Sequence, residues 1–134
     1  MSKILGLDYG KRRTGIAISD PARELAFPRK TLSFRKEGTL FKEIKKLCEE
    51  EAVEKIIVGL PLNMQGHYTK QTESTEAFAN RLKGAIDLPI ELFDERLSTL
   101  QAEKALIEKG LKKYSEIDEI AAQMVLQAWL DRSA

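Results

Sequence analysis

The hydrophobic pattern of the sequence changes its period after residue 32, and this change limits the possible folds. Before that point, apolar runs over 4–7 and 15–19 flank a short glycine-containing segment, and a third run covers about 25–32. Such runs predict a β-hairpin that is extended into a three-stranded antiparallel meander. Pro21 and Pro28 place the third strand at an edge of the sheet, because proline cannot donate a ladder hydrogen bond.

After residue 32, helical and strand periods alternate. A helix around 40–48 precedes an uninterrupted apolar strand over 55–62, which we expect to be covered on both faces. A helix over 73–83, a strand over 89–93 and two helices follow, one over 98–109 and one that Ser115 caps. The residues expected inside are Leu40, Ile44, Leu47, Cys48, Ala77, Phe78, Leu82, Ile117, Ile120, Ala121, Met124, Val125, Trp129 and Leu130.

This order of elements predicts one α/β domain over residues 1–134. Its sheet should be mixed and five-stranded, with the antiparallel meander joined to two parallel strands and helices on both faces. The first strand and the last two then run parallel, so their carboxyl ends meet where such sheets usually bind ligands.

The composition narrows the possible chemistry. Cys48 is the only cysteine and His67 the only histidine, which excludes an internal disulfide and a Cys/His zinc site. A Ser-His-Asp triad would need His67, which lies in a polar segment without a nucleophile motif. A bound metal would therefore have oxygen ligands, which favours magnesium, manganese or calcium.

Charge and hydropathy do not identify a binding partner. The net charge of +1 neither demands nor excludes a nucleic acid, and the basic clusters at 11–13, 29–30, 35–36 and 112–113 are each compatible with ordinary surface charge. No apolar run is long enough to span a bilayer and no leader-like segment begins the chain, so we expect a cytoplasmic protein with no membrane partner.

Three carboxylates are expected at the carboxyl ends of the parallel strands. Asp8 closes the first strand, Glu95 follows the last strand, and Asp118 lies in the first turn of the last helix. Ala121 and Ala122 would allow this helix to approach the sheet closely. Converging acids are unfavourable without a cation among them, and two divalent ions about 4 Å apart can drive phosphodiester hydrolysis.

Each of these acids also has a structural interpretation. Asp8 is typical of a residue beside a hairpin turn, and Glu95 could pair with Arg96 on the surface. Asp118 would favour the helix dipole at its position whether or not it is catalytic. Asp20 is not a candidate, because the second strand runs back and carries it about 15 Å from Asp8.

Five motifs, in order along almost the whole chain, resemble the YqgF/RuvX family. They are LGLDYG at 5–10, GIAISD at 15–20, IVGLPLN at 57–63, DERLST at 94–99 and IDEIAA at 117–122. This family is a minimal branch of the RNase H-like superfamily and is related to RuvC-type resolvases. The resemblance implies an RNase H-like nuclease that acts on structured nucleic acid, most specifically the 5′ end of pre-16S ribosomal RNA, with Holliday-junction resolution as the alternative.

The resemblance also implies roles for single residues. The acids that match the family's metal-binding and catalytic positions are Asp8, Glu95 and Asp118, which would hold two Mg²⁺ or Mn²⁺ ions. The expected substrate contacts are Lys11, Arg12, Arg13, Asn63 and Arg96. The chain departs from many members at Lys11, where a small hydroxyl residue is common, and at Thr14, where an apolar residue is common.

Two other function classes deserve comparison. Asp8-Tyr-Gly10 followed by Gly15 is similar to the phosphate-binding hairpin of actin-like ATPases and sugar kinases, but those proteins close two such domains around ATP. A non-catalytic binding module is the other class, and the retention of all three acids argues against it. The expected partners are structured RNA or branched DNA and pre-ribosomal particles. No strong dimer signal is visible, so we expect a monomer or a weak homodimer.

Overall fold

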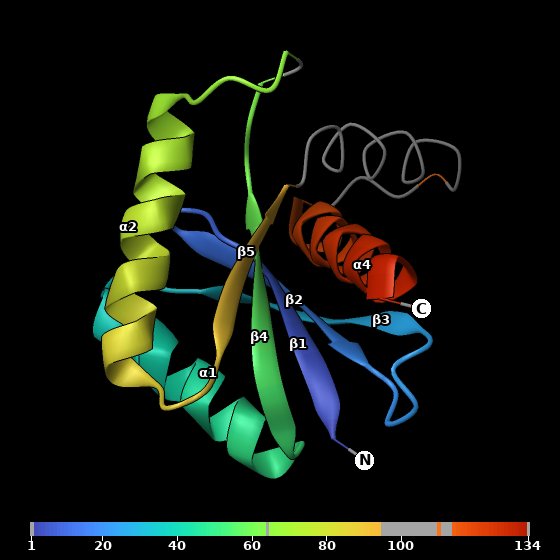
Figure 1. Ribbon diagram of the computed structural model, residues 1–134. Helices are drawn as coiled ribbons and strands as arrows, with labels where there is room; N and C mark the ends of the chain where they lie inside the picture. The colour runs from blue at the N-terminus through green and yellow to red at the C-terminus, as the bar shows by residue number, and fades with distance from the viewer. Residues whose placement is uncertain (1, 64, 95–109, 111–113, 134) are drawn as a thin grey trace.

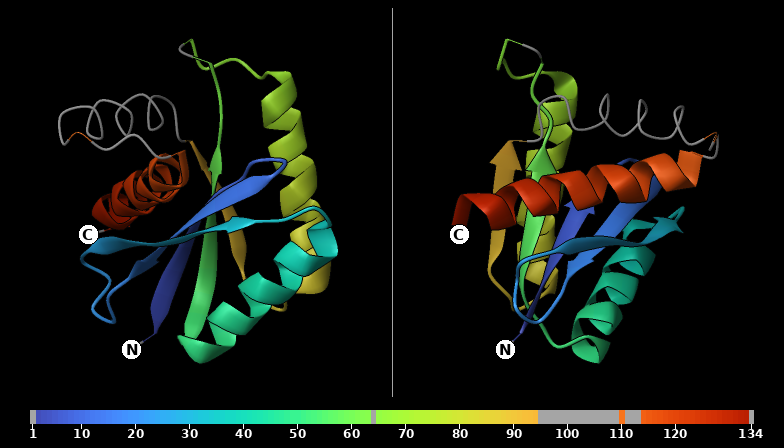
Figure 2. Two further views of the ribbon diagram at one scale, coloured as in Figure 1. Left: turned by 180° about the vertical axis from the view of Figure 1, so that it is seen from behind. Right: turned by 90° about the vertical axis from the view of Figure 1, so that its right-hand side faces the viewer.

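A computed structural model describes residues 2–63, 65–94, 110 and 114–133. The strands form one five-stranded sheet in the order β3-β2-β1-β4-β5, with α1 and α2 on one face and α4 on the other (Figures 1 and 2). The bounds are β1 Lys3–Asp8, β2 Arg13–Ser19, β3 Ala26–Ser33, α1 Glu37–Glu50, β4 Val53–Leu60, α2 Lys70–Ala85, β5 Ile90–Asp94 and α4 Tyr114–Ser133. The helix predicted over 98–109 lies outside the described residues.

The strand directions confirm the predicted mixed sheet. β1, β2 and β3 pair antiparallel as a meander, whereas β4 runs parallel to β1 and β5 runs parallel to β4. β3 is an edge strand, as Pro28 predicted. The carboxyl ends of β1, β4 and β5 therefore face the same way, toward the top of Figure 1.

The face under α1 and α2 is filled by large side chains. Strand residues Leu5, Leu7, Ile16, Ile56 and Val58 form one buried cluster with Leu40, Ile44 and Leu47 of α1 and Phe78 and Leu82 of α2. The buried face of α2 is set by positions three and four apart, which are Thr72, Thr75, Phe78, Ala79 and Leu82. The prediction that Ala77 points inward was therefore wrong: Ala77 is exposed, because its place in the helical repeat lies away from the centre of this buried face.

The face under α4 holds a second buried cluster. It consists of Ile4, Ala17, Ala26 and Ile57 from the sheet and Ala122, Val125, Leu126, Trp129 and Leu130 from α4. Ile57 belongs to this cluster and its neighbours Ile56 and Val58 to the other, which confirms that β4 is covered on both faces. Met124 is only half-buried, contrary to prediction, because Val125 and Leu126 face the sheet; Ile117 and Ile120 are half-buried as well.

Two predicted helix starts need correction. α2 begins at Lys70 rather than 73, because Thr69 and Thr72 form a capping box at its N-terminus. α4 begins at Tyr114, so Ser115 lies inside the helix and Asp118 is its fifth residue rather than part of its first turn. Among the described residues, no helix is long and apolar enough to cross a membrane.

Candidate active site

Helix α4 rests directly on the sheet at two glycines. A Cβ atom on Gly15 of β2 would lie 2.0 Å from the carbonyl oxygen of Asp118, and one on Gly6 of β1 would lie 2.8 Å from Cβ of Leu126. No other amino acid fits either position unless the helix or the strands move. Glycine within a strand often marks such a close approach of another backbone, and here it brings α4 against β1 and β2.

This contact brings Asp8 and Asp118 to the same place. Asp8 is the partner of Gly15 in the antiparallel β1–β2 pair, and residues directly opposite each other project to the same face. Side chains alternate along a strand, so Asp8 shares the α4 face with Ile4 and Gly6. Two half-buried acids from β1 and α4 therefore lie beside the same glycine.

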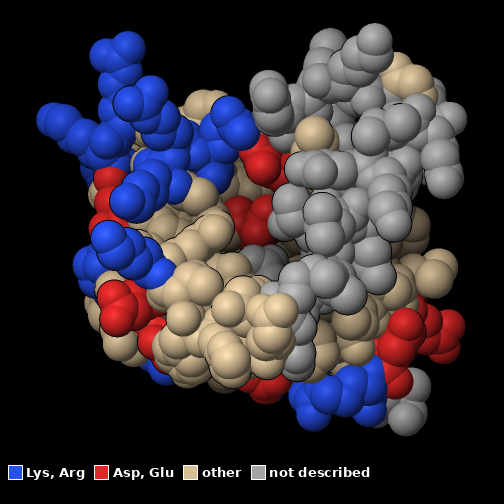
Figure 3. All heavy atoms as spheres, turned by 90° about the horizontal axis from the view of Figure 1, so that it is seen from above, with Lys and Arg blue, Asp and Glu red and all other residues tan. Residues whose placement is uncertain are grey.

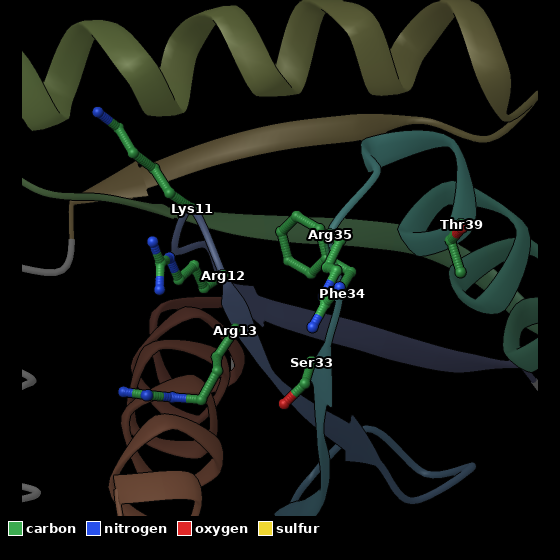
Figure 4. A pocket seen from close by; sticks show the side chains of 7 residues that line it. All are labelled: Lys11, Arg12, Arg13, Ser33, Phe34, Arg35 and Thr39. Atoms are coloured by element: carbon green, nitrogen blue, oxygen red, sulfur yellow. The ribbon is translucent and has the colours of Figure 1, made fainter.

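Arg13 forms an ion pair with Asp118. Its Nε donates a hydrogen bond to Oδ2 of Asp118 over 2.7 Å, and the two side chains are 43% and 21% exposed. Arg13 was expected to contact phosphate. The structure pairs its guanidinium with Asp118 instead. Figure 4 shows the Arg13 side chain extending over α4, next to Arg12 and Lys11 of the same loop.

Other acids at this end of the sheet do not join the pair in the described part of the chain. Asp94 is exposed at the end of β5 and shares the face of Ile90 and Leu92, which pack on the α1/α2 side. Glu95 and Arg96, both predicted site residues, lie outside the described residues. Within the described ranges, no three Asp, Glu, His or Cys side chains are grouped to hold a metal.

Asp20 lies at the opposite end of the sheet, as expected. Its carboxylate accepts hydrogen bonds from the backbone N–H groups of Leu25 and Glu24, at 3.0 and 2.8 Å, and so closes the β2–β3 turn. These backbone hydrogen bonds, that of Leu25 first, hold the pKa of Asp20 below its ordinary value. Asp20 therefore has a structural role.

The backbone of the loop between β1 and β2, which carries three cations, is fixed by close contacts. A Cβ on Gly10 would lie 2.5 Å from the carbonyl oxygen of Arg13, so the turn closes tightly on itself. The backbone N–H of Phe34 donates to the carbonyl of Arg12 over 3.0 Å, which ties the loop to the end of β3. The side chains of Lys11, Arg12 and Arg13 spread outward from this backbone (Figure 4).

These side chains form one wall of an open hollow of about 980 Å³, here called the basic groove. Its lining residues are Lys11, Arg12, Arg13, Ser33, Phe34, Arg35 and Thr39. Viewed onto the carboxyl ends of the parallel strands, Lys and Arg gather at one corner with acidic side chains directly beside them (Figure 3). The role of Arg35 in this groove was not predicted, because 35–36 gave only a pair of charges in the sequence.

Asn63 organises its own loop. Its Oδ1 accepts hydrogen bonds from the backbone N–H groups of Gln65 and His67, at 3.0 and 2.9 Å, and its N–H donates to the carbonyl of His67. Asparagine commonly makes turns of this kind. The structure thus gives Asn63 a conformational role, and its contact with substrate stays a prediction.

Comparison with known proteins identifies the family. The model of the RuvX family, described as Holliday junction resolvase, matches residues 2–132. A relative from Maridesulfovibrio salexigens, named a pre-16S rRNA nuclease, is 41% identical over 98% of this chain and 99% of its own. A relative of the same name from Chloroflexus aurantiacus is 40% identical over 96% of this chain and 86% of its own.

Solved structures share the fold at low sequence identity. RuvC from T. thermophilus, in complex with a Holliday junction, superposes with a TM-score of 0.57 and 13% identity, over 100% of this chain and 97% of its own. The large terminase nuclease from phage G20c gives 0.57 and 12%, over 96% and 81%. The mixed sheet is therefore RNase H-like, as the resemblance implied. Because the family model spans nearly the whole chain, the chain belongs to the RuvX family, whose members are hydrolases acting on phosphodiester bonds.

Proposed function

We propose that this protein is a metal-dependent nuclease that cleaves structured RNA at the 5′ end of pre-16S ribosomal RNA. The observation that carries the proposal is that Asp8 and Asp118 lie beside Gly15 on the α4 face of the sheet. The names of relatives that match 96% or more of the chain support the choice of substrate. The net charge is only +1, so we further propose that a pre-ribosomal particle presents the RNA.

The acidic pair suits a hard divalent ion. Carboxylate oxygens are the ligands that Mg²⁺ and Mn²⁺ prefer, and no side chain stands between Asp118 and the strand at Gly15. Asp8 and Asp118 would hold the metal together with Glu95. The support for Glu95 is its match to the family motif alone. Two bound ions would supply an activated water and stabilise the leaving oxygen of the phosphodiester.

The protein's own residues position the reaction. Asp8 ends a buried strand and Asp118 is carried by a helix that lies against that strand, so neither carboxylate depends on a loop for its place. Arg13 holds Asp118 through its hydrogen bond. Lys11 and Arg12 extend from the rigid β1–β2 loop and are suited to bind the phosphates that flank the cleaved bond.

A cleavage assay tests this proposal. Labelled RNA carrying the 5′ precursor sequence of 16S rRNA and a four-way DNA junction are incubated with Mg²⁺, Mn²⁺ or EDTA. We expect metal-dependent cleavage of the RNA that Asp8→Asn abolishes and that Asp94→Asn retains, because Asp94 lies on the other face of the sheet. Full activity of Asp8→Asn would remove Asp8 from the site. Binding without cleavage by the wild-type protein would favour a non-catalytic module.

Holliday-junction resolution is the second candidate, and the description of the family model favours it. Symmetric cutting of a four-way junction needs two active sites related by a two-fold axis, and therefore a dimer. Paired, symmetric cuts in the junction, together with a dimer mass in light scattering, would select this activity over RNA processing. A monomer that cuts only the RNA would exclude it.

A further inference from the structure

Three hollows meet at Lys11 and form one continuous surface. The basic groove lies on one side of this residue. A second hollow of about 300 Å³ runs from Tyr9 and Lys11 to Lys70 and Ser74 at the start of α2. A third, of about 380 Å³, contains Tyr9, Lys11 and Arg35 and so connects the other two. We call the whole surface the extended basic groove and define it by its cations, which are Arg13, Arg12, Lys11, Arg35 and Lys70.

We propose that the extended basic groove binds a double-helical arm of the nucleic-acid substrate through its phosphates. The groove begins at Arg13, beside Asp118, crosses the β1–β2 loop and ends at the N-terminus of α2. It therefore leads away from the α4 face, where the acids lie, to the α1/α2 side of the sheet. The inference rests on the proposed function for the cleaved bond. It extends the phosphate contacts of Lys11 and Arg12, which lie near that bond, to Arg35 and Lys70 on the other side of the β1–β2 loop.

Charge is distributed unevenly over the molecule, because this surface is basic although the net charge of the chain is only +1. Five cations define the groove, and of these Arg13 is paired with Asp118. Among the described residues that line the groove, the acid is Glu37, which is paired with Arg81 through two hydrogen bonds of 2.8 Å. The groove thus keeps a positive potential while the rest of the molecule is acidic on balance. Such a field attracts a polyanion and orients it.

The groove is preformed. Tyr9, in its floor, stacks on Phe78 of the core with ring centroids 4.0 Å apart and planes 12° apart. Burial, and next the charge of Glu37, raise the pKa of the Tyr9 phenol, so this residue is neutral. The hydrogen bond from the backbone N–H of Phe34 to the carbonyl of Arg12 fixes the other side of the groove. The backbone and the aromatic floor of the groove are therefore fixed before a ligand binds, which lowers the conformational cost of binding.

The aromatic residues of the groove favour a duplex over a single strand. Proteins that bind single strands stack the bases on exposed aromatic rings. Tyr9 and Phe34, the aromatic residues among those that line the groove, are instead packed against the core. Guanidinium and ammonium groups that contact phosphates read the backbone and not the bases. The groove is therefore suited to the regular phosphate spacing of a stem.

The test compares two matched double variants. Arg35→Ala with Lys70→Ala removes two groove cations, which lie just before α1 and at the first residue of α2. Lys45→Ala with Lys83→Ala removes two exposed cations of the same helices that do not line the groove. Binding of a labelled RNA hairpin, and of a single strand of equal length, is measured by fluorescence anisotropy in EDTA over a range of salt concentrations.

We expect the groove variant to bind the hairpin at least tenfold more weakly than the wild-type protein. The slope of the logarithm of the association constant against the logarithm of salt concentration should fall by about 1.8, or about 0.9 for each lost phosphate contact. The control variant should keep both values, and circular dichroism should show both variants folded. An unchanged slope in the groove variant, or equal affinity for the single strand, would overturn the proposal. Competition by polyglutamate as strong as that by unlabelled hairpin would also overturn it, in favour of an acidic polypeptide.

Failure of this inference is distinguishable from failure of the proposed function. If the wild-type protein cleaves RNA and the groove variant keeps the wild-type slope, the groove proposal alone is wrong. If the slope falls as expected and no cleavage is found, the groove is a binding site and the nuclease proposal is wrong. Asp8→Asn should keep the wild-type slope, because its side chain lies on the α4 face.

Discussion

The two faces of the sheet pack their helices in different ways. Toward α1 and α2 the strands present large aliphatic side chains that meet Phe78, Leu82 and the apolar face of α1. Toward α4 they present Gly6 and Gly15, so that helix backbone touches strand backbone near the candidate site. The first face buries more apolar volume and suits a stabilising core. The second fixes the position of Asp118 relative to Asp8.

This difference predicts that variants on the two faces will fail in different ways. On the α1/α2 face, a removed side chain should cost stability and leave the acids in place. On the α4 face, a single added methyl group should disturb the acids.

The largest effect is expected from Phe78→Ala. Phe78 is fully buried and contacts both Tyr9 and Phe41, so its removal leaves a cavity and should lower the free energy of unfolding by about 3–5 kcal/mol. Urea denaturation measures this loss. Metal-dependent cleavage by the protein that remains folded should fall much less. A variant that is stable but inactive would contradict the division between the faces.

Gly15→Ala should have the next largest effect, and mainly on activity. The new Cβ would have to displace the backbone of Asp118. A misplacement of about 1 Å can reduce catalysis about a hundredfold, and overpacking costs about 1–3 kcal/mol of stability. Cleavage rates and urea midpoints measure the two losses.

Gly84→Ala is the matched control for Gly15→Ala. A Cβ on Gly84, in α2, would meet no atom within 4 Å. Alanine is favoured over glycine in helices, so this variant should gain about 0.5–1 kcal/mol and keep its activity. If both glycine variants cleave RNA equally well, the close approach of α4 has no catalytic importance.

A smaller effect is expected from Thr14→Val. The hydroxyl of Thr14 is fully buried and has no hydrogen-bond partner within the described ranges. Valine has nearly the same shape without the polar group, so the variant should be more stable by about 1 kcal/mol. Thr14→Ser, which keeps the hydroxyl and loses the methyl group, should be less stable than wild type. Thermal denaturation that ranks Ser above Val would mean that the hydroxyl is satisfied.

The smallest effect concerns Glu91, which anchors the far end of α4. Its carboxylate accepts hydrogen bonds from Lys55 at 2.9 Å, Trp129 at 2.6 Å and Arg132 at 3.3 Å. The bond from Lys55, and then that from Trp129, hold the pKa of Glu91 below its ordinary value of 4.5. This stabilisation is therefore present above pH 4.5 and is lost as the pH falls through the lower pKa of the folded state.

Glu91→Gln should accordingly be less stable than wild type at pH 7, and the difference should shrink below pH 4. Because the Glu91 side chain is 35% exposed, we expect at most about 1 kcal/mol at pH 7. Urea denaturation at both pH values measures it. A difference that is constant from pH 3 to pH 7 would mean that the charge of Glu91 does not contribute.

The strands and the helix faces could largely be predicted from local pattern. The apolar runs of β1, β2 and β4 are short and are typical of strands, not of helices. The position of Asp8 at the end of β1 follows from the first of these runs. Helix starts were less predictable: the Thr69 capping box begins α2 three residues before the predicted start, and the Ser115 motif lies inside α4 and not at its start. Capping motifs also occur within helices, so the motif alone does not fix a boundary.

The close contact at the site could not be derived from local pattern. Gly15 lies in an apolar strand, where glycine is a signal of close backbone approach, but the sequence does not say which segment approaches it. The pairing of Arg13 with Asp118 and the joining of Arg35 and Lys70 through Lys11 likewise depend on contacts between distant segments. The family motifs identified Asp118, and the fold supplied its neighbours.

Calorimetric titration with Mn²⁺ measures whether Asp8 and Asp118 share a divalent ion. The wild-type protein, Asp8→Asn, Asp118→Asn and the double variant are titrated under the same conditions. Because both acids would hold the same ion, each single variant should lose most of the affinity, and the double variant should lose little more. Losses that add independently in the double variant, or wild-type affinity in Asp118→Asn, would contradict a shared metal site.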